Sequence, residues 1–325
     1  MTGAPAGQAE PLSRRRYGRV ALVFAAFLLV FGVAAAAFDP AALAERLASL
    51  SPGLVAALLG LSLVNYAVRL ARWRLFSKPM RARAPFAEDA VTYLASFALT
   101  ATPGKAGELL RIWLLKRRCG LPYARTLPVF LADRLCDLLA LTILSFGGLG
   151  WVVGGRIAVP VAAVLAGSIL LLFLRPAPLI ALVGTLYGRF RRAPRHFAQA
   201  RRALRQGARL RRPGLWLAGI ALGLLGWGCE GTGLWLVLQA LGSPVALVDA
   251  AAIFALSLVA GVVSLLPGGL GGTEAGMVGL LLLRGVPTAT ALAATLTVRL
   301  ATLWFAVALG LVFLPVALRG GPRRR

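Results

Sequence analysis

The sequence predicts an all-α polytopic membrane protein with about six full spans, two re-entrant broken hairpins and an inverted internal repeat, about eight membrane segments in all. Hydrophobic residues make up 59% of the 325 positions and charged residues only 14%, and the mean hydropathy is +0.80. A soluble chain needs a largely polar surface, so lipid must surround most of this one. The other two observations are long apolar runs and basic residues confined to alternate connections.

The full spans are predicted from apolar runs long enough to cross a hydrocarbon core of about 30 Å, which takes roughly 20 helical residues. The runs contain few alternating patterns, so they are helices that satisfy their own backbone hydrogen bonds. The predicted spans are 20–38, 54–70, 127–149, 159–174, 215–241 and 289–314.

The orientation is predicted from the placement of the basic residues, which give a formal charge of +25. They cluster in 14–19, 72–83, 116–125, 175–212 and 319–325, whereas the other connections contain almost none. By the positive-inside rule, both termini lie in the cytoplasm, as expected for a bacterial inner-membrane protein. A nucleic-acid groove in 187–212 is the less favoured alternative, because orientation and anionic headgroups account for the same charges.

Around one transmembrane domain, 20–316, the charges define three cytoplasmic segments: the N-terminus 1–19, the loop 175–213 and the tail 317–325. The first apolar run has no clean small-residue cleavage site, so it reads as a retained span rather than a signal peptide. Three cysteines and one histidine lack disulfide or zinc spacing. We therefore expect no metal and no cofactor.

Two apolar stretches break in the middle and predict the re-entrant hairpins. The first, 90–102, breaks at Pro103-Gly104 and is flanked by basic sequence on both sides, so it enters and leaves by the cytoplasmic face. The second, 250–266, breaks at Pro267-Gly268-Gly269 between two charge-poor connections and enters from the opposite face.

The two hairpins belong to a repeated unit. Arg134 lies 26 residues after Glu108, and Arg299 lies 25 residues after Glu274, each in the next apolar span. The order of span, broken hairpin and span thus occurs twice, in units of about 54–150 and 214–316. The first unit starts outside and the second inside, which predicts an inverted repeat whose broken helices meet near the bilayer midplane.

Charged residues at membrane depth are the candidate substrate-binding and translocation residues, because a lone charge there costs roughly 2.5 kcal/mol or more. The alternative is that they are ion pairs that only hold helices together, for example Glu108 with Arg111 or Arg134, and Glu274 with Arg299. A further polar stripe runs along Asn65, Arg69 and Arg72. The candidates are Lys105, Glu108, Arg111, Asp133, Arg134, Asp137, Glu230, Glu274 and Arg299.

Glycines and prolines form the hairpin breaks, where the chain must turn and leave backbone groups unpaired. A helix that starts after such a turn offers free N–H groups to an anion such as a phosphate headgroup. Close helix approach and plain surface turns are the two alternatives. The break residues are Pro103, Gly104, Gly107, Pro267, Gly268, Gly269, Gly271 and Gly272.

Several strings resemble the transmembrane region of lysylphosphatidylglycerol synthases, also described as a flippase-like family, over about 20–316. They are Ala101-Thr102-Pro103-Gly104-Lys105-Ala106-Gly107-Glu108, Asp133-Arg134, Leu266-Pro267-Gly268-Gly269-Leu270-Gly271-Gly272-Thr273-Glu274 and Arg299. The resemblance implies lipid movement between leaflets. In the best-known relatives this region is fused to a soluble aminoacyl-tRNA-dependent transferase, which we expect to be absent here. Some stand-alone relatives are associated with glycosyltransferases or hopanoid synthesis.

We therefore predict a lipid translocase or facilitator and no enzyme. Lys105, Arg111, Arg134 and Arg299 would neutralise a phosphate, and the carboxylates would bind amines, balance arginines or take up protons. The partners are membrane lipids: anionic phospholipids, aminoacylated lipids, polyprenyl-linked sugars or hopanoids. The sequence has no phosphate-binding loop for ATP. The alternatives are a non-transporting partner of a lipid-modifying or glycosyltransferase enzyme, docked through 187–212, and an intramembrane enzyme using carboxylates as acid and base.

Overall fold

The computed structural model describes residues 40–101, 106–148, 208–210, 212–264 and 269–319, together with the single residues 25, 164, 167 and 185. Within these residues every regular element is a helix, as predicted. Apart from these single residues, the predicted spans 20–38 and 159–174 and most of the basic loop lie outside the described part of the chain. So do the terminal segments 1–19 and 320–325, and Pro103, Gly104, Lys105, Pro267 and Gly268.

Within the described residues, three helices are long and apolar enough to cross a membrane. They are α3 (Pro52–Ser77), α10 (Pro213–Ala240) and the continuous helix Thr288–Arg319, which confirm the predicted spans 54–70, 215–241 and 289–314. The last consists of α13 (Thr288–Arg299), a π-helical turn η6 (Leu300–Trp304) and α14 (Phe305–Arg319). α3 and α10 each begin with a proline. Proline fits the first position of a helix because the N–H that it lacks would have no hydrogen-bond partner within the helix.

A fourth long helix, α6 (Tyr123–Gly148), occupies the predicted span 127–149. It is as long as α3, and it carries three charged residues, Asp133, Arg134 and Asp137, near its middle. Helix α6 therefore carries three of the candidate site residues inside the helical bundle.

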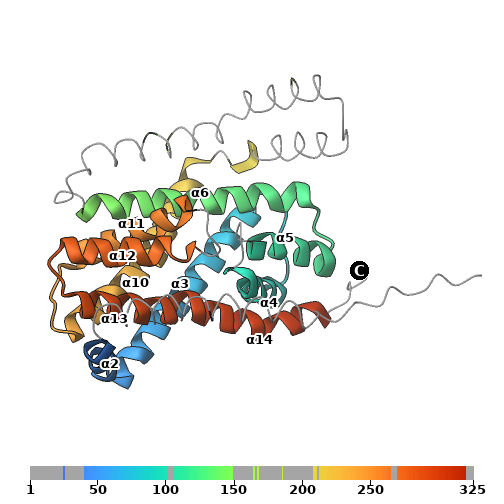
Figure 1. Ribbon diagram of the computed structural model, residues 1–325. Coiled ribbons are helices and arrows are strands. Elements are labelled where there is room, and N and C mark those ends of the chain that lie inside the picture. Colours follow the sequence, from blue (N-terminus) through green and yellow to red (C-terminus); the bar gives the residue numbers. More distant parts are fainter. Residues whose placement is uncertain are drawn as a thin grey trace, which may run out of the picture.

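Each predicted hairpin position contains two helices that pack against each other. The first pair is α4 (Phe86–Ser96), which ends in the 3₁₀ turn η1 (Phe97–Leu99), and α5 (Ala106–Cys119). The second pair is α11 (Leu247–Val263) and α12 (Gly272–Leu283). Figure 1 places the two pairs at opposite ends of the molecule, with α6 and the helix α13–α14 running along both.

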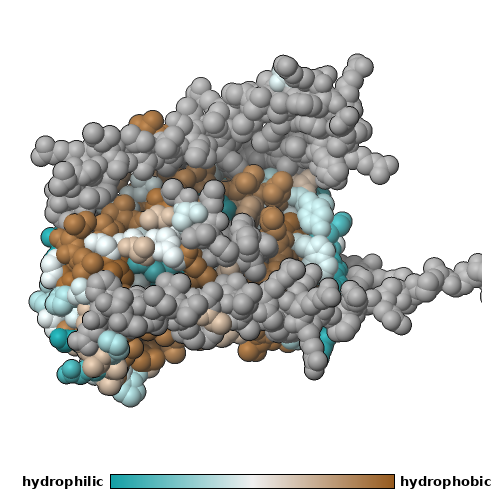
Figure 2. All heavy atoms as spheres, in the orientation of Figure 1, coloured by the Kyte–Doolittle hydropathy of each residue, from teal (hydrophilic) through white to brown (hydrophobic). Residues whose placement is uncertain are grey.

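Contacts between the pairs and the long helices build the interior. α3 packs against α10, α11 packs against α6, and α14 packs against α4 and η1. The short helices α2 (Pro40–Ala48) and η4 (Ala208–Leu210) complete the described elements. Large apolar side chains such as Leu63, Leu217 and Val312 are exposed, and apolar residues cover the middle of the face in Figure 2, with hydrophilic ones at its ends. Such a surface suits lipid.

The close contact of α14 with η1 depends on Gly310. A Cβ atom at this position would overlap the backbone of Phe97 and Ala98, which cannot move aside as a side chain could. We expect Gly310→Ala to destabilise the protein by about 1–3 kcal/mol, the usual cost of overpacking. Thermal unfolding in detergent measures this. The matched control is Gly279→Ala in α12, where nothing lies within 4 Å of the new Cβ and the melting temperature should not fall.

Candidate functional site

The centre of the molecule contains a network of buried ion pairs between α3 and α6. Arg72 Nε lies 2.7 Å from Asp133 Oδ1, and Arg72 Nη2 lies 2.6 Å from Asp137 Oδ1. Arg69 Nη2 donates to Asp137 Oδ2 at 3.2 Å. The helical spacings place Arg69 and Arg72 on one face of α3, and Asp133 and Asp137 on one face of α6. The side chain of Arg72 is fully buried, so its charge depends on these two carboxylates.

Helix α10 and Arg134 extend this network. Arg134 Nη2 lies 2.6 Å from Asp133 Oδ2 and 3.0 Å from Asp137 Oδ2. The indole Nε1 of Trp227, on α10, donates to Asp137 Oδ1 at 2.9 Å, and the Arg69 guanidinium lies 4.9 Å from the centre of the Trp227 ring. Asp137 therefore accepts hydrogen bonds or ion pairs from three arginines and one tryptophan.

Glu230 lies next to this network on α10 and is 6% exposed. Its Oε1 accepts a hydrogen bond of 2.5 Å from Asn65 Nδ2. Among the described residues it forms no ion pair, unlike the other buried carboxylates of α6 and α12. It lines a small cavity together with Ser62, Cys229 and Thr302. A buried carboxylate of this kind is costly unless it serves a ligand or carries a proton.

The predicted pair of Glu274 and Arg299 is confirmed. Arg299 Nε lies 2.6 Å from Glu274 Oε1, and both side chains are buried. The other oxygen, Oε2, accepts the backbone N–H of Gly271 at 2.6 Å and so caps the start of α12. Gly271 has a φ of 83°, a conformation that glycine adopts without strain.

The π-helical turn follows Arg299 directly and faces α3. Ser62 Oγ donates to the carbonyl of Ala301 at 3.0 Å, and the Tyr66 hydroxyl donates to the carbonyl of Thr302 at 2.7 Å. Such turns leave carbonyls outside the regular helical pattern and occur frequently at functional sites. The same face of α3 therefore contacts the Glu230 cavity and the turn next to Arg299.

Arg111, on α5, is buried without an ion pair in the described part of the chain. Its guanidinium lies 3.7 Å from the ring centre of Trp73 and 4.4 Å from that of Tyr93. Neither its Nε nor its Nη2 has a hydrogen-bond partner there, and the Tyr93 hydroxyl and the Trp73 Nε1 also lack one. A buried guanidinium with two unused donors is suited to an anion or to ordered water.

The structure thus brings together most of the predicted residues that it describes. Asp133, Arg134 and Asp137 share one network, Glu230 adjoins it, and Glu274 meets Arg299. The side chain of Glu108 lies outside the described residues, so its pairing with Arg111 or Arg134 stays a prediction. Of the predicted breaks, Gly269 and Gly271 lie between α11 and α12, Gly272 is the first residue of α12, and Gly107 lies at the start of α5.

Sequence reasoning gave too little weight to the stripe on α3. Asn65, Arg69 and Arg72 recur at helical spacing, and each contacts a predicted carboxylate. Trp227, Ser62 and Tyr66 were missed, because an aromatic or hydroxyl side chain in an apolar run carries no signal of its own. The described residues contain no group of histidine, cysteine and carboxylate side chains arranged to hold a metal ion.

Two comparisons bear on this arrangement. The family model described as "Lysylphosphatidylglycerol synthase TM region" matches residues 19–310. Two UPF0104 membrane proteins of Methanothermobacter thermautotrophicus are similar to parts of the chain. One is 38% identical over 92 residues, which is 28% of each chain, and the other is 33% identical over 97 residues, which is 30% of this chain and 29% of the relative. The similarity therefore spans less than a third of either relative's length.

Proposed function

The chain belongs to the lysylphosphatidylglycerol synthase TM region family, and from this premise we propose that it moves a lipid with a polar headgroup between the leaflets of the bacterial cytoplasmic membrane. It would act as a translocase or facilitator, without catalysis of its own. The headgroup would pass through the charged interior while the hydrocarbon tails stay in lipid or in an apolar groove.

The observation that carries this proposal is an apolar groove beside the buried charges. The groove has a volume of about 430 Å³ and lies between α3, α6, α10 and α11. Leu61 and Cys229 line both this groove and the small cavity of Glu230. A lipid has this same division into an apolar tail and a polar head, so a tail in the groove would bring the head to Glu230.

The buried charged residues suit a headgroup that carries both a positive and a negative charge. Arg111 has unused donors for a phosphate, and Glu230 has no cationic partner among the described residues, so it could bind an amine or a proton. The other charges, Arg69, Arg72, Arg134, Asp133 and Asp137, compensate one another. They would replace the hydration of the headgroup during passage.

The packing of the helices supports the predicted inverted repeat, an arrangement that many alternating-access transporters use. α3 and α10 hold equivalent places in the two units and pack against each other. α4 of the first unit packs against α14 of the second, and α11 of the second packs against α6 of the first. In the two units α4 corresponds to α11, and α6 corresponds to the helix α13–α14. A two-fold axis that exchanged the units would therefore turn the contact of α4 with α14 into the contact of α11 with α6. The two hairpins would then approach the midplane from opposite faces.

The proposed orientation places both termini and the loop 175–213 in the cytoplasm. The hairpin α4–α5 would enter from that side and α11–α12 from the other, in line with their positions at opposite ends of the molecule (Figure 1). The motivation is the asymmetry of the basic residues. Labelling of single cysteines introduced into 187–212, on a background without the native cysteines, by an impermeant reagent in intact cells would contradict this orientation.

Filling the apolar groove should block transport without unfolding the protein. Gly228 lines the groove, and nothing lies within 4 Å of a Cβ atom built there. We expect Gly228→Leu to reduce, by about tenfold or more, the rate at which a fluorescent phospholipid reaches the outer leaflet of proteoliposomes, because roughly 1.4 kcal/mol of lost tail binding is enough. Quenching of the outer-leaflet label by dithionite gives the rate.

The matched control is Gly60→Leu on α3. Gly60 also has open space at its Cβ position but does not line the groove. It should leave both the scrambling rate and the melting temperature unchanged. If the wild-type protein moves no labelled phosphatidylglycerol, phosphatidylethanolamine or polyprenyl phosphate, the translocase proposal is wrong and a role as a non-transporting partner of a lipid-modifying enzyme replaces it.

A further inference from the structure

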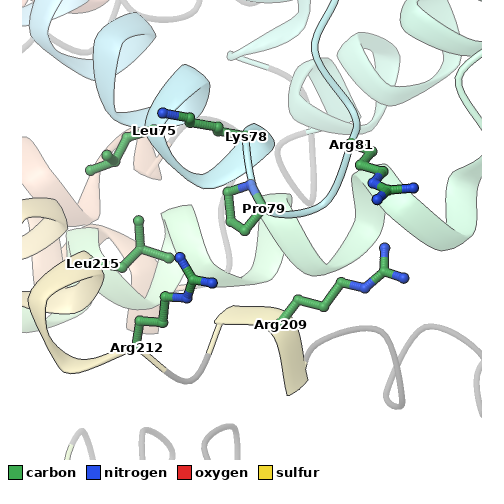
Figure 3. Close-up of a pocket in the computed structure, with 7 residues that line it drawn as sticks. All are labelled: Leu75, Lys78, Pro79, Arg81, Arg209, Arg212 and Leu215. Atoms are coloured by element: carbon green, nitrogen blue, oxygen red, sulfur yellow. The ribbon is translucent and has the colours of Figure 1, made fainter.

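A second cavity lies away from the buried charges, where the C-terminal end of α3 meets the start of α10. It has a volume of about 760 Å³, and Figure 3 shows the seven residues around it. Four of these are cations, none is an acid, and the rest are apolar. The lining residues are Leu75, Lys78, Pro79, Arg81, Arg209, Arg212 and Leu215.

The four cations are exposed, and none of them forms an ion pair within the described part of the chain. They come from two walls. Lys78 and Arg81 follow α3, whereas Arg209 and Arg212 precede α10 (Figure 3). Four like charges around one cavity create a positive potential there, which favours an anion between them.

The two walls are held together by a buried core. Phe76 and Met80 on the first wall and Leu210 and Trp216 on the second belong to one cluster and are almost fully buried. The Phe76 and Trp216 rings lie 5.6 Å apart, and Trp216 Nε1 donates to the carbonyl of Leu210 at 2.8 Å. Arg81 and Arg209 directly neighbour two of these buried residues, Met80 and Leu210, so the cavity does not depend on surface side chains alone.

Arg81 is the unusual residue of this cavity. It has a φ of 51°, and among the described residues it is the one non-glycine residue with positive φ. Ala82 N donates to Ser77 O at 3.1 Å and Arg81 N to Lys78 O at 3.2 Å, the pattern of a helix end that normally places glycine where Arg81 stands. An arginine at such a position is strained, and strain of this kind collects at functional sites.

The start of α10 adds to the positive potential. Its first residue is Pro213, and no side chain caps this end of the helix. The N-terminus of a long helix carries a partial positive charge that favours anions. Arg212, the residue before the helix, lines the cavity at this point.

We propose that this cavity binds a phosphate-bearing anion with two or more negative charges. A guanidinium group can donate two parallel hydrogen bonds to two oxygens of one phosphate. Leu75 and Leu215 provide an apolar border next to the charges. The phosphate belongs either to the headgroup of a lipid in the adjoining leaflet or to a free solute. The site is independent of the proposed transport, because it shares no lining residue with the apolar groove or the Glu230 cavity.

Binding of inorganic pyrophosphate to the full-length protein tests this site. The protein is placed in nanodiscs of phosphatidylcholine and titrated by calorimetry at low and at physiological salt. We expect saturable binding that weakens with salt, and an affinity at least about tenfold lower for Arg81→Gly and for Arg212→Gln, since a hydrogen bond to a charged group contributes on this scale. Arg81→Gly should keep or raise the melting temperature, because glycine suits the left-handed conformation.

The matched control is Arg83→Gln, which removes one exposed charge from the same loop but lies outside the cavity lining. Unchanged affinity in this variant supports a defined site. An equal loss in Arg83→Gln, or no pyrophosphate binding by the wild type, overturns the proposal and leaves the four charges as orientation signals. Repeating the titration in nanodiscs that contain phosphatidic acid, whose phosphomonoester can carry two negative charges, separates the sources: competition assigns the site to a lipid headgroup, and undiminished binding assigns it to a free phosphate compound.

Discussion

Replacing Asp137 with Asn is expected to lower the unfolding free energy by about 3–5 kcal/mol, the cost of removing one partner from a buried ion pair. Arg72 Nη2, Arg69 Nη2 and Arg134 Nη2 lie 2.6, 3.2 and 3.0 Å from the Asp137 carboxylate. After the change, Asp133 alone must compensate the fully buried Arg72 charge and Arg134 as well. Thermal unfolding of the purified protein in detergent measures the loss.

Asp249→Asn is the matched control for this variant. Asp249 pairs with Arg284, and both side chains of that pair are more exposed than those of Arg72 and Asp137. Because water screens such a pair, its removal should cost no more than about 1 kcal/mol. Equal losses of stability in the two variants would mean that water reaches the central network as well as it reaches the pair of Asp249 and Arg284. The central ion pairs would then not be buried from water as the structure describes.

The second large effect is expected on transport, from the pair of Glu274 and Arg299. Each single change, Glu274→Gln or Arg299→Gln, removes one member of a buried ion pair, so each should destabilise the protein by about 3–5 kcal/mol. The double variant contains no unpaired charge, and its glutamine can still accept the Gly271 N–H that caps α12. We therefore expect its melting temperature to return close to that of the wild type.

Transport by the double variant separates a structural from a functional role. If the pair lines the path of the headgroup, the double variant folds but scrambles labelled lipid at least about tenfold more slowly, because the charges that replace the headgroup's water are gone. Expression, melting temperature and dithionite quenching are measured on the same preparations of both singles and the double. Full scrambling by the stable double variant would assign the pair to helix packing and would remove these two residues from the proposed path.

The sequence by itself determined the class of the protein and the identity of most charged residues inside it. Composition and run length predicted helices in lipid, and three of the predicted spans are confirmed by α3, α10 and the helix Thr288–Arg319. The cost of charge in lipid singled out Asp133, Asp137 and Glu274, and all of them are buried. These properties follow from local composition and from the solvent, so they need no knowledge of which helices meet.

Only the tertiary structure decided which partners these charges have. Local spacing offered Glu108 as a partner for Arg111, and that pairing stays a prediction because the Glu108 side chain lies outside the described residues. What the structure adds is that the Arg111 guanidinium lies against the rings of Trp73 and Tyr93, which come from two other helices. Likewise the partners of Asp137 come from α3, α6 and α10 together. Such contacts depend on the rotation and depth at which the helices pack, and residues far apart in the sequence set that packing. Helical periodicity places a side chain on a face, but the neighbouring helix determines what that face meets.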